Sequence, residues 1–261
     1  TLIDGADGLV LAAETAIGKH PLASVDFIRS LIMRYYDNRE INTLLDDPHI
    51  ILSPLLNPPH GDKLVQQIRT QNVISSIDDY EHQLTVDEAV LMDLEQIANG
   101  GYSPLKGFMD ENEVKSVLKD FYLPNGEVWT MPVILQAHKE QIESYKRGDR
   151  IALISKKDNN IYGILYLSDL FQYDFKKTAL DWFKTYDSKH PGVLNLKTRG
   201  EFCLGGHIKL VRKMSHPFNQ YTFNPLETRY VFEHKGWRKV IGFHTRNVIH
   251  RAHEHIQLKA L

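Results

Sequence analysis

Apolar residues recur at helical spacing in several segments of the chain. The segments run over residues 21–35, 85–99, 174–187, 223–236 and from 250 to the end. Prolines near the start of two of them suit a first helical turn, where a missing N–H costs nothing. Asn99-Gly100-Gly101 is a typical helix end, because glycine readily takes the left-handed backbone conformation. The pattern therefore predicts helices along the whole length of the chain.

Short apolar runs bounded by turn residues predict strands. They lie at residues 8–11, 128–135, 150–155, 161–167 and 240–243. Pro132 places the second run at a sheet edge, because proline cannot donate a ladder hydrogen bond. The three central runs would pack as a small β-barrel. Residues 37–57 are rich in Asn, Asp and Pro, which prevents a long helix and predicts a linker.

Composition narrows the function classes. The chain has 261 residues, of which 42% are hydrophobic, so it can form one large or two ordinary domains. A net charge of -2 favours neither nucleic acid nor an anionic membrane as the main partner. The single cysteine, Cys203, suits a reducing compartment. With no apolar run of about 20 residues and no signal-peptide layout at the start, we expect a cytoplasmic protein.

A possible phosphate site follows the last predicted strand, where a polar turn leads into the last predicted helix. Backbone N–H groups at a helix start lack intrahelical partners and attract anions. His250 and His253 are three residues apart and share one face at that end. Arg246 adds a planar cation suited to phosphate or sulfate oxygens, and Thr245 and Asn247 add short polar donors.

Two plainer interpretations of these histidines stay open. They could form half of a zinc site, with His244 and His255 close in sequence. A closed structural zinc site usually recruits cysteine, and the chain has one, so we predict no metal site. They could also be solvated histidines on a basic helix.

The turn and helix start resemble the signature of the ATP sulfurylase (sulfate adenylyltransferase) family, Gln-Thr-Arg-Asn-Pro, one residue, then His-Arg-Ala-His-Glu. This chain departs at His244, where the family usually has Gln, and at Val248, where it often has Pro. Further landmarks are the run at residues 58–65, Gly-Gly-Tyr-Ser-Pro-Leu-Lys-Gly-Phe-Met at 100–109, and Gly-Gly-His-Ile-Lys-Leu at 205–210. Adjacent glycines at 100 and 101 favour a structural turn there rather than a phosphate loop.

The resemblance implies transfer of AMP from MgATP to sulfate, giving adenosine 5′-phosphosulfate and pyrophosphate. By this likeness Thr245, Arg246 and Asn247 are catalytic. His244 and Arg246 bind sulfate, while Asn247, His250 and His253 bind the ATP phosphates. An imidazole at 244 can carry a charge near neutral pH, unlike an amide, so we expect sulfate affinity to depend more on pH than in Gln-bearing relatives.

The resemblance also implies α+β and α/β domains. A PUA-like β-barrel domain would span residues 58–213, and the first strand-helix unit of a Rossmann-like nucleotidyltransferase domain would span 214–261. One strand-helix unit cannot form a layered sheet alone, so we expect the chain to be a fragment with a truncated catalytic domain. A homo-oligomer, and a fused or partner phosphosulfate kinase, are expected from the likeness.

The first 36 residues resemble the last strand and helix of the pyruvate kinase barrel, a TIM-type fold. Asp-Gly-Ala-Asp at residues 4–7 and Glu-Thr-Ala at 14–16 match, whereas Ala12 and Ala13 replace a Ser and a Gly. A family hydroxyl is thus absent, and we assign no kinase activity to this remnant.

Other functions stay open beside the sulfurylase. The chain could be a noncatalytic scaffold or an RNA-interacting PUA-like fusion module, although no basic excess supports RNA binding. It could also be an adenylyltransferase with another acceptor, because His-x-x-His recurs among enzymes that transfer nucleotidyl groups.

Overall fold

The computed structural model describes residues 56–68 and 80–260. The predictions for residues 1–36, and most of the linker at 37–57, lie outside the described residues. The chain divides into two compact units, one of which spans Pro59–Pro225. The described part of the other comprises residues 56–58 and 226–260, and each unit is taken by itself below.

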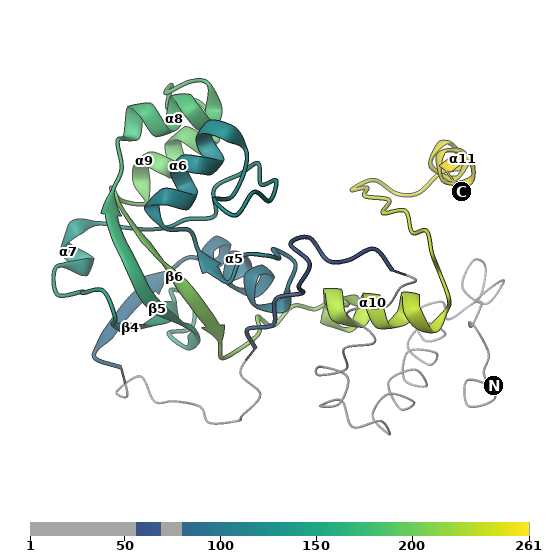
Figure 1. Ribbon diagram of the computed structural model, residues 1–261, viewed down its shortest axis with the longest axis horizontal. Helices are drawn as coiled ribbons and strands as arrows, with labels where there is room; N and C mark the ends of the chain where they lie inside the picture. Colours follow the sequence, from purple (N-terminus) through teal and green to yellow (C-terminus); the bar gives the residue numbers. More distant parts are fainter. Residues whose placement is uncertain (1–55, 69–79, 261) are drawn as a thin grey trace. The chain divides into compact units, whose positions relative to one another are not determined.

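A six-stranded mixed sheet forms the centre of the larger unit (Figure 1). Its strands are β1 (His82–Val86), β2 (Gly107–Phe108), β3 (Leu135–Ala137), β4 (Arg150–Ser155), β5 (Ile161–Gln172) and β6 (Phe202–Leu210). The strand order is β1-β4-β5-β6-β2, with β3 also paired to β6. Among the strands named above, β1 and β4 pair in parallel and the other pairs are antiparallel. The long antiparallel pair of β5 and β6 is therefore the part of the sheet to which the shorter strands attach.

The strands predicted at 150–155 and 161–167 are confirmed, although β5 continues to Gln172. The strand predicted at 128–135 is wrong for most of its length, since only Leu135 belongs to a strand. Residues 121–129 instead fold back on themselves, with the Trp129 N–H donating to the Phe121 carbonyl at 2.8 Å. These local bonds use backbone groups that a regular sheet edge would otherwise pair.

Helix α5 (Glu88–Asn99) covers the sheet and confirms the helix predicted at 85–99. The Asp87 carboxylate accepts the Val90 N–H at its start, and Gly100, with φ +90°, ends it in the left-handed conformation. Its buried face includes Leu94 and Ile97, both without exposed surface. Burying a leucine side chain contributes roughly 1.5–3 kcal/mol, so α5 anchors this core.

Three further helices gather at one end of the sheet, namely α6 (Glu111–Asp120), α8 (Phe175–Phe183) and α9 (Pro191–Thr198) (Figure 1). The helix predicted at 174–187 is confirmed in part, because it stops at Lys184 in the left-handed conformation. The described part of this unit also contains a four-residue helix, α7 (Lys139–Ile142), and a 3₁₀ turn at Asn219–Tyr221.

The two glycine-containing runs at 100–109 and 205–210 pair with each other in the sheet. Gly107 of β2 lies opposite His207, and Phe108 lies opposite Gly206 of β6. A side chain at Gly107 would collide with the Gly206 carbonyl oxygen. Nearby, the Ser103 hydroxyl accepts the Val65 N–H at 3.0 Å and donates to the Gly100 carbonyl at 2.8 Å. The turn at residues 100–109 is therefore structural, as its glycines predicted.

The smaller unit holds α10 (Pro225–His234) and α11 (Arg251–Ala260), which confirm the helices predicted at 223–236 and from 250 onwards. Residues 238–245 form neither helix nor strand, and the side chains of Val240, Ile241 and Phe243 are exposed. The prediction of a buried strand at 240–243 is therefore wrong for this chain. A strand buried on both faces requires neighbouring strands, and none pairs with this segment among the described residues.

Candidate functional site

The candidate site lies in the smaller unit, where a short polar turn precedes α11. The Asn247 N–H donates to the Thr245 hydroxyl at 3.1 Å, and the hydroxyl contacts the Asn247 carbonyl at 3.4 Å. A threonine that bonds backbone two residues on is a common way to fix a turn. The turn therefore sets the path of the backbone on both sides of Arg246.

His250 and His253 are brought together at the start of α11, as their spacing predicted. Their rings stack with centroids 4.0 Å apart and planes 28° apart. The His250 carbonyl accepts the Glu254 N–H at 3.1 Å, so His250 is the residue that caps the helix. The Ala252 N–H donates to Nδ1 of His250 at 3.3 Å, and the His250 N–H donates to Nδ1 of His253 at 3.4 Å.

Phe243 adds a contact that the sequence pattern did not single out. Its ring meets the His253 ring edge to face, with centroids 5.7 Å apart and planes 67° apart. Aromatic pairs favour this geometry because the positive edge of one ring faces the negative face of the other. The sequence showed Phe243 only as an apolar residue, so nothing in the pattern indicated this role.

The two remaining candidates are less constrained. His244 and Arg246 are exposed, and no hydrogen bond or ion pair is recorded for either within the part of the chain that the structure describes. The guanidinium of Arg246 is thus available to an anion, but the structure does not join it to the two histidines. The site consists of a fixed turn, a stacked histidine pair and a solvated cation.

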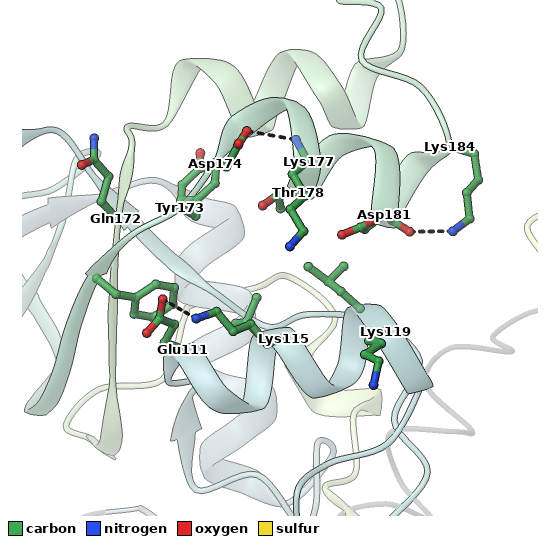
Figure 2. A pocket seen from close by; sticks show the side chains of 13 residues that line it. Glu111, Lys115, Lys119, Gln172, Tyr173, Asp174, Lys177, Thr178, Asp181 and Lys184 are labelled. Carbon is green, nitrogen blue, oxygen red and sulfur yellow. Dashed lines mark hydrogen bonds and ion pairs between the residues drawn. The ribbon is translucent and has the colours of Figure 1, made fainter.

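The larger unit contains a cleft of about 680 Å³ between α6 and α8, which the sequence did not predict because α6 itself was not predicted. Figure 2 shows side chains of both helices around it. Its charged lining comprises Glu111, Lys115, Lys119, Asp174, Lys177, Asp181 and Lys184. Lys115 pairs with Glu111 at 2.7 Å, and three carboxylates face four lysines overall, so the cleft does not select strongly for charge.

Gln136 and Tyr173 of the larger unit form a part-buried polar cluster whose hydrogen bonds hold the fold together. Nε2 of Gln136 lies 2.6 Å from the Tyr173 hydroxyl and within hydrogen-bond distance of the Leu196 and Gly200 carbonyls, to which its two N–H groups can donate. Burial raises the pKa of Tyr173, and burial likewise raises the pKa of Cys203 to about 12. A thiol with such a pKa is protonated at neutral pH and is a poor nucleophile.

Neither clustered metal ligands nor a membrane-spanning helix is present in the described part of the chain. Within residues 56–68 and 80–260, no group of three or more His, Cys, Asp or Glu side chains is arranged to hold a metal ion. No helix in those ranges is long and apolar enough to cross a membrane.

Comparison with known proteins finds two family matches, of which the PUA-like match covers more than half of the chain. Residues 57–213 match the PUA-like domain family, and residues 219–261 match the ATP-sulfurylase family. A solved structure, a hexameric APS kinase from Thiobacillus denitrificans, is 25% identical with a TM-score of 0.57, and the match covers 77% of this chain and 36% of that one.

Curated relatives carry the name sulfate adenylyltransferase. The protein from Pyrococcus abyssi is 38% identical over 210 residues, and the one from Staphylothermus marinus is 41% identical over 206 residues. These alignments cover 79% and 78% of this chain but 54% and 53% of the relatives. The chain spans about half the length of the curated relatives it matches.

Proposed function

The chain belongs to the PUA-like domain family, and from the ATP-sulfurylase match at residues 219–261 we propose that the full-length protein is a sulfate adenylyltransferase. It would transfer AMP from MgATP to sulfate, giving adenosine 5′-phosphosulfate and pyrophosphate. The observation that carries this proposal is the ATP-sulfurylase match over the segment in which Thr245 and Asn247 form a fixed turn and His250 and His253 stack at a helix start.

In this reaction a sulfate oxygen attacks the α-phosphorus of ATP, and the bond to the departing pyrophosphate breaks. No side chain needs to form a covalent bond, so the protein would act by positioning reactants and neutralising charge. Arg246 and His244 would hold sulfate. Thr245 and Asn247 would orient the α-phosphate, and His250 and His253 would hold the leaving phosphates. Mg²⁺ would arrive bound to ATP, as part of the substrate.

The domain plan is part of the same proposal. Residues 58–213 would form the PUA-like domain, and residues 214–261 would begin a Rossmann-like nucleotidyltransferase domain. Residues 37–57 would link them to the pyruvate-kinase-like remnant of a TIM-type barrel at 1–36. We also propose a homo-oligomer in the cytoplasm, with a phosphosulfate kinase as a fused or separate partner. The likeness to a hexameric APS kinase supports the oligomer and the association with a kinase.

Pyrophosphate release from MgATP, measured on the full-length protein with and without sulfate, tests the activity. Sulfate should be required, and Arg246→Ala should lower the rate by roughly 10²–10³-fold, as loss of one donor to a developing charge does elsewhere. Arg238→Ala is a matched control, because Arg238 is also exposed and lies outside the signature.

The same assay separates the competing functions. Release that does not require sulfate would instead indicate an adenylyltransferase with another acceptor. No release from a folded full-length protein would favour the scaffold or RNA-interacting alternative.

A further inference from the structure

We propose that His250 and His253 form a variant of the capping box made of two imidazoles, which fixes the tautomer of both rings. In an ordinary capping box, the side chain of the residue before a helix accepts the N–H of the third helical residue, and the side chain of that third residue accepts the N–H of the residue before the helix. His250 accepts the Ala252 N–H through Nδ1, and His253 accepts the His250 N–H through Nδ1. His253 thus makes the second bond of the pattern, while His250 makes the first to Ala252, the second helical residue, which is also an accepted partner of a capping side chain.

Helix α6 of the same protein shows the ordinary form. The Asp110 carboxylate accepts the Glu113 N–H at 2.8 Å, and the Glu113 carboxylate accepts the Asp110 N–H at 3.0 Å. The separation of three residues is the same in both boxes. His-x-x-His thus has the spacing that a helix start requires of two acceptors, independently of any ligand.

The hydrogen bonds have a chemical consequence. An imidazole nitrogen that accepts a hydrogen bond carries no proton, so the proton of each neutral ring is on Nε2. Nδ1 of each ring is thus occupied by the helix, which leaves Nε2–H of each ring as a donor.

Phe243 is a positioning residue for this arrangement. Its ring lies edge to face against His253, on the segment that precedes the turn. Since an imidazole can rotate about its side-chain bonds, a contact on one side of the ring restricts which nitrogen faces the backbone. Phe243 therefore acts through His253 rather than by touching a ligand.

If the proposed function holds, the hydrogen bonds of the box determine which donors of this segment can bind the phosphates of ATP. The N–H groups of His250 and Ala252 are used by the box, so they are not free for a polyanion at the helix start. The phosphate oxygens would meet two Nε2–H donors beside the N–H groups of Arg251 and His253, which the box does not use. The positive charge would come from Arg246, whose guanidinium has no recorded partner among the described residues.

A long-range ¹H–¹⁵N correlation spectrum of the ¹⁵N-histidine-labelled full-length protein at neutral pH tests the tautomers, because it distinguishes protonated from unprotonated ring nitrogens. Both rings should show a proton on Nε2 and none on Nδ1. A proton on Nδ1 of either ring overturns the proposal. Phe243→Leu should give a tautomer mixture at His253, whereas Phe223→Leu, at another exposed phenylalanine, should not. An unchanged His253 in Phe243→Leu would remove Phe243 from the arrangement.

Two substitutions of His250 distinguish its role in accepting the Ala252 N–H from its role as a donor through Nε2–H. In His250→Asn the short amide oxygen can still accept the Ala252 N–H, but its NH₂ does not reach the position of Nε2. In His250→Gln the longer amide places a donor near that position and loses the cap. Hydrogen exchange at Ala252 should stay slow in the first variant and become faster in the second. Equal protection in both variants contradicts the box.

ATP binding is measured on the same proteins. His250→Asn should bind MgATP about tenfold more weakly or worse, because a hydrogen bond to a charged group is lost. Unchanged binding in that variant overturns the donor role. If the wild-type protein binds no ATP, the proposed function fails while the spectrum still decides the tautomers, so the two failures are distinguishable.

Discussion

The two units of this protein differ in where they place their apolar side chains. In the larger unit Leu94, Ile97 and Leu165 have no exposed surface, and the sheet and α5 are held by such contacts. In the smaller unit α11 has no buried residue, Val248 is 89% exposed and Leu258 is 67% exposed. The residues that hold the fold together and those proposed to act on a ligand therefore belong to different regions.

This difference means that stability and function should respond to different substitutions. A buried position is fixed by many neighbours, so a change there acts on the free energy of unfolding. A solvated position is fixed by a few local hydrogen bonds, so a change there acts on ligand binding with little effect on the fold. Paired substitutions, one in each region, test the separation.

The largest expected contrast is between two leucines. Leu94→Ala should lower the free energy of unfolding by about 3 kcal/mol, because it opens a cavity where α5 meets β5 at Gly163. Leu258→Ala, at a side chain that is 67% exposed, should change it by less than about 0.5 kcal/mol. Denaturant unfolding of the two variants measures both, and similar losses would show that α11 is buried in the folded protein.

Two glycines provide a second contrast. Gly107→Ala should cost about 2 kcal/mol, because the added methyl group collides with the Gly206 carbonyl and forces β2 away from β6. At Gly242 the same methyl group would meet nothing within 4 Å, so Gly242→Ala should be close to neutral for stability. Thermal unfolding of both variants gives the comparison, and a neutral Gly107→Ala would contradict the tight β2–β6 pairing.

The sequence predicted the helices whose first and last residues are of types that commonly begin or end a helix. Asp87 and Gly100 mark the limits of α5, and α11 begins where His250 predicted. The sequence pattern did not predict α6, although Asp110 and Glu113 form a capping box at its start. The strand at 128–135 was wrong because an apolar run does not show whether its backbone groups pair locally or with another strand.

The candidate site was predicted in part for similar reasons. The spacing of His250 and His253 placed them on one helical face, and the structure confirms that they lie together. Their use as helix caps was not visible, since histidine is not among the residues preferred before a helix. The contact of Phe243 with His253 depends on the path of the intervening turn, which periodicity does not describe.

The smallest expected effect is a pH dependence of stability that comes from Asp158, an exposed residue of the larger unit that is held by local hydrogen bonds. Asp158, in the turn between β4 and β5, accepts the Asn160 N–H at 3.2 Å and the Tyr162 hydroxyl at 3.0 Å. Hydrogen bonds from Asn160, and then from Tyr162 and Ser155, lower the pKa of this carboxyl to about 2. Because the folded-state pKa is depressed, the charged carboxylate adds stability that is present above pH 3.8, its unfolded value, and is lost as the pH falls towards about 2.

Asp158→Asn should therefore be less stable than the wild type near pH 6, with the difference shrinking as the pH falls towards about 2. Asp120→Asn is the control, because Asp120 is exposed and lies in a 3.5 Å ion pair with the exposed Lys119; it should follow the wild-type dependence. Urea unfolding of the three proteins from pH 6 to about pH 2 makes the measurement. A difference between Asp158→Asn and the wild type that does not change with pH would mean that packing in the turn, rather than the charge of Asp158, carries the effect.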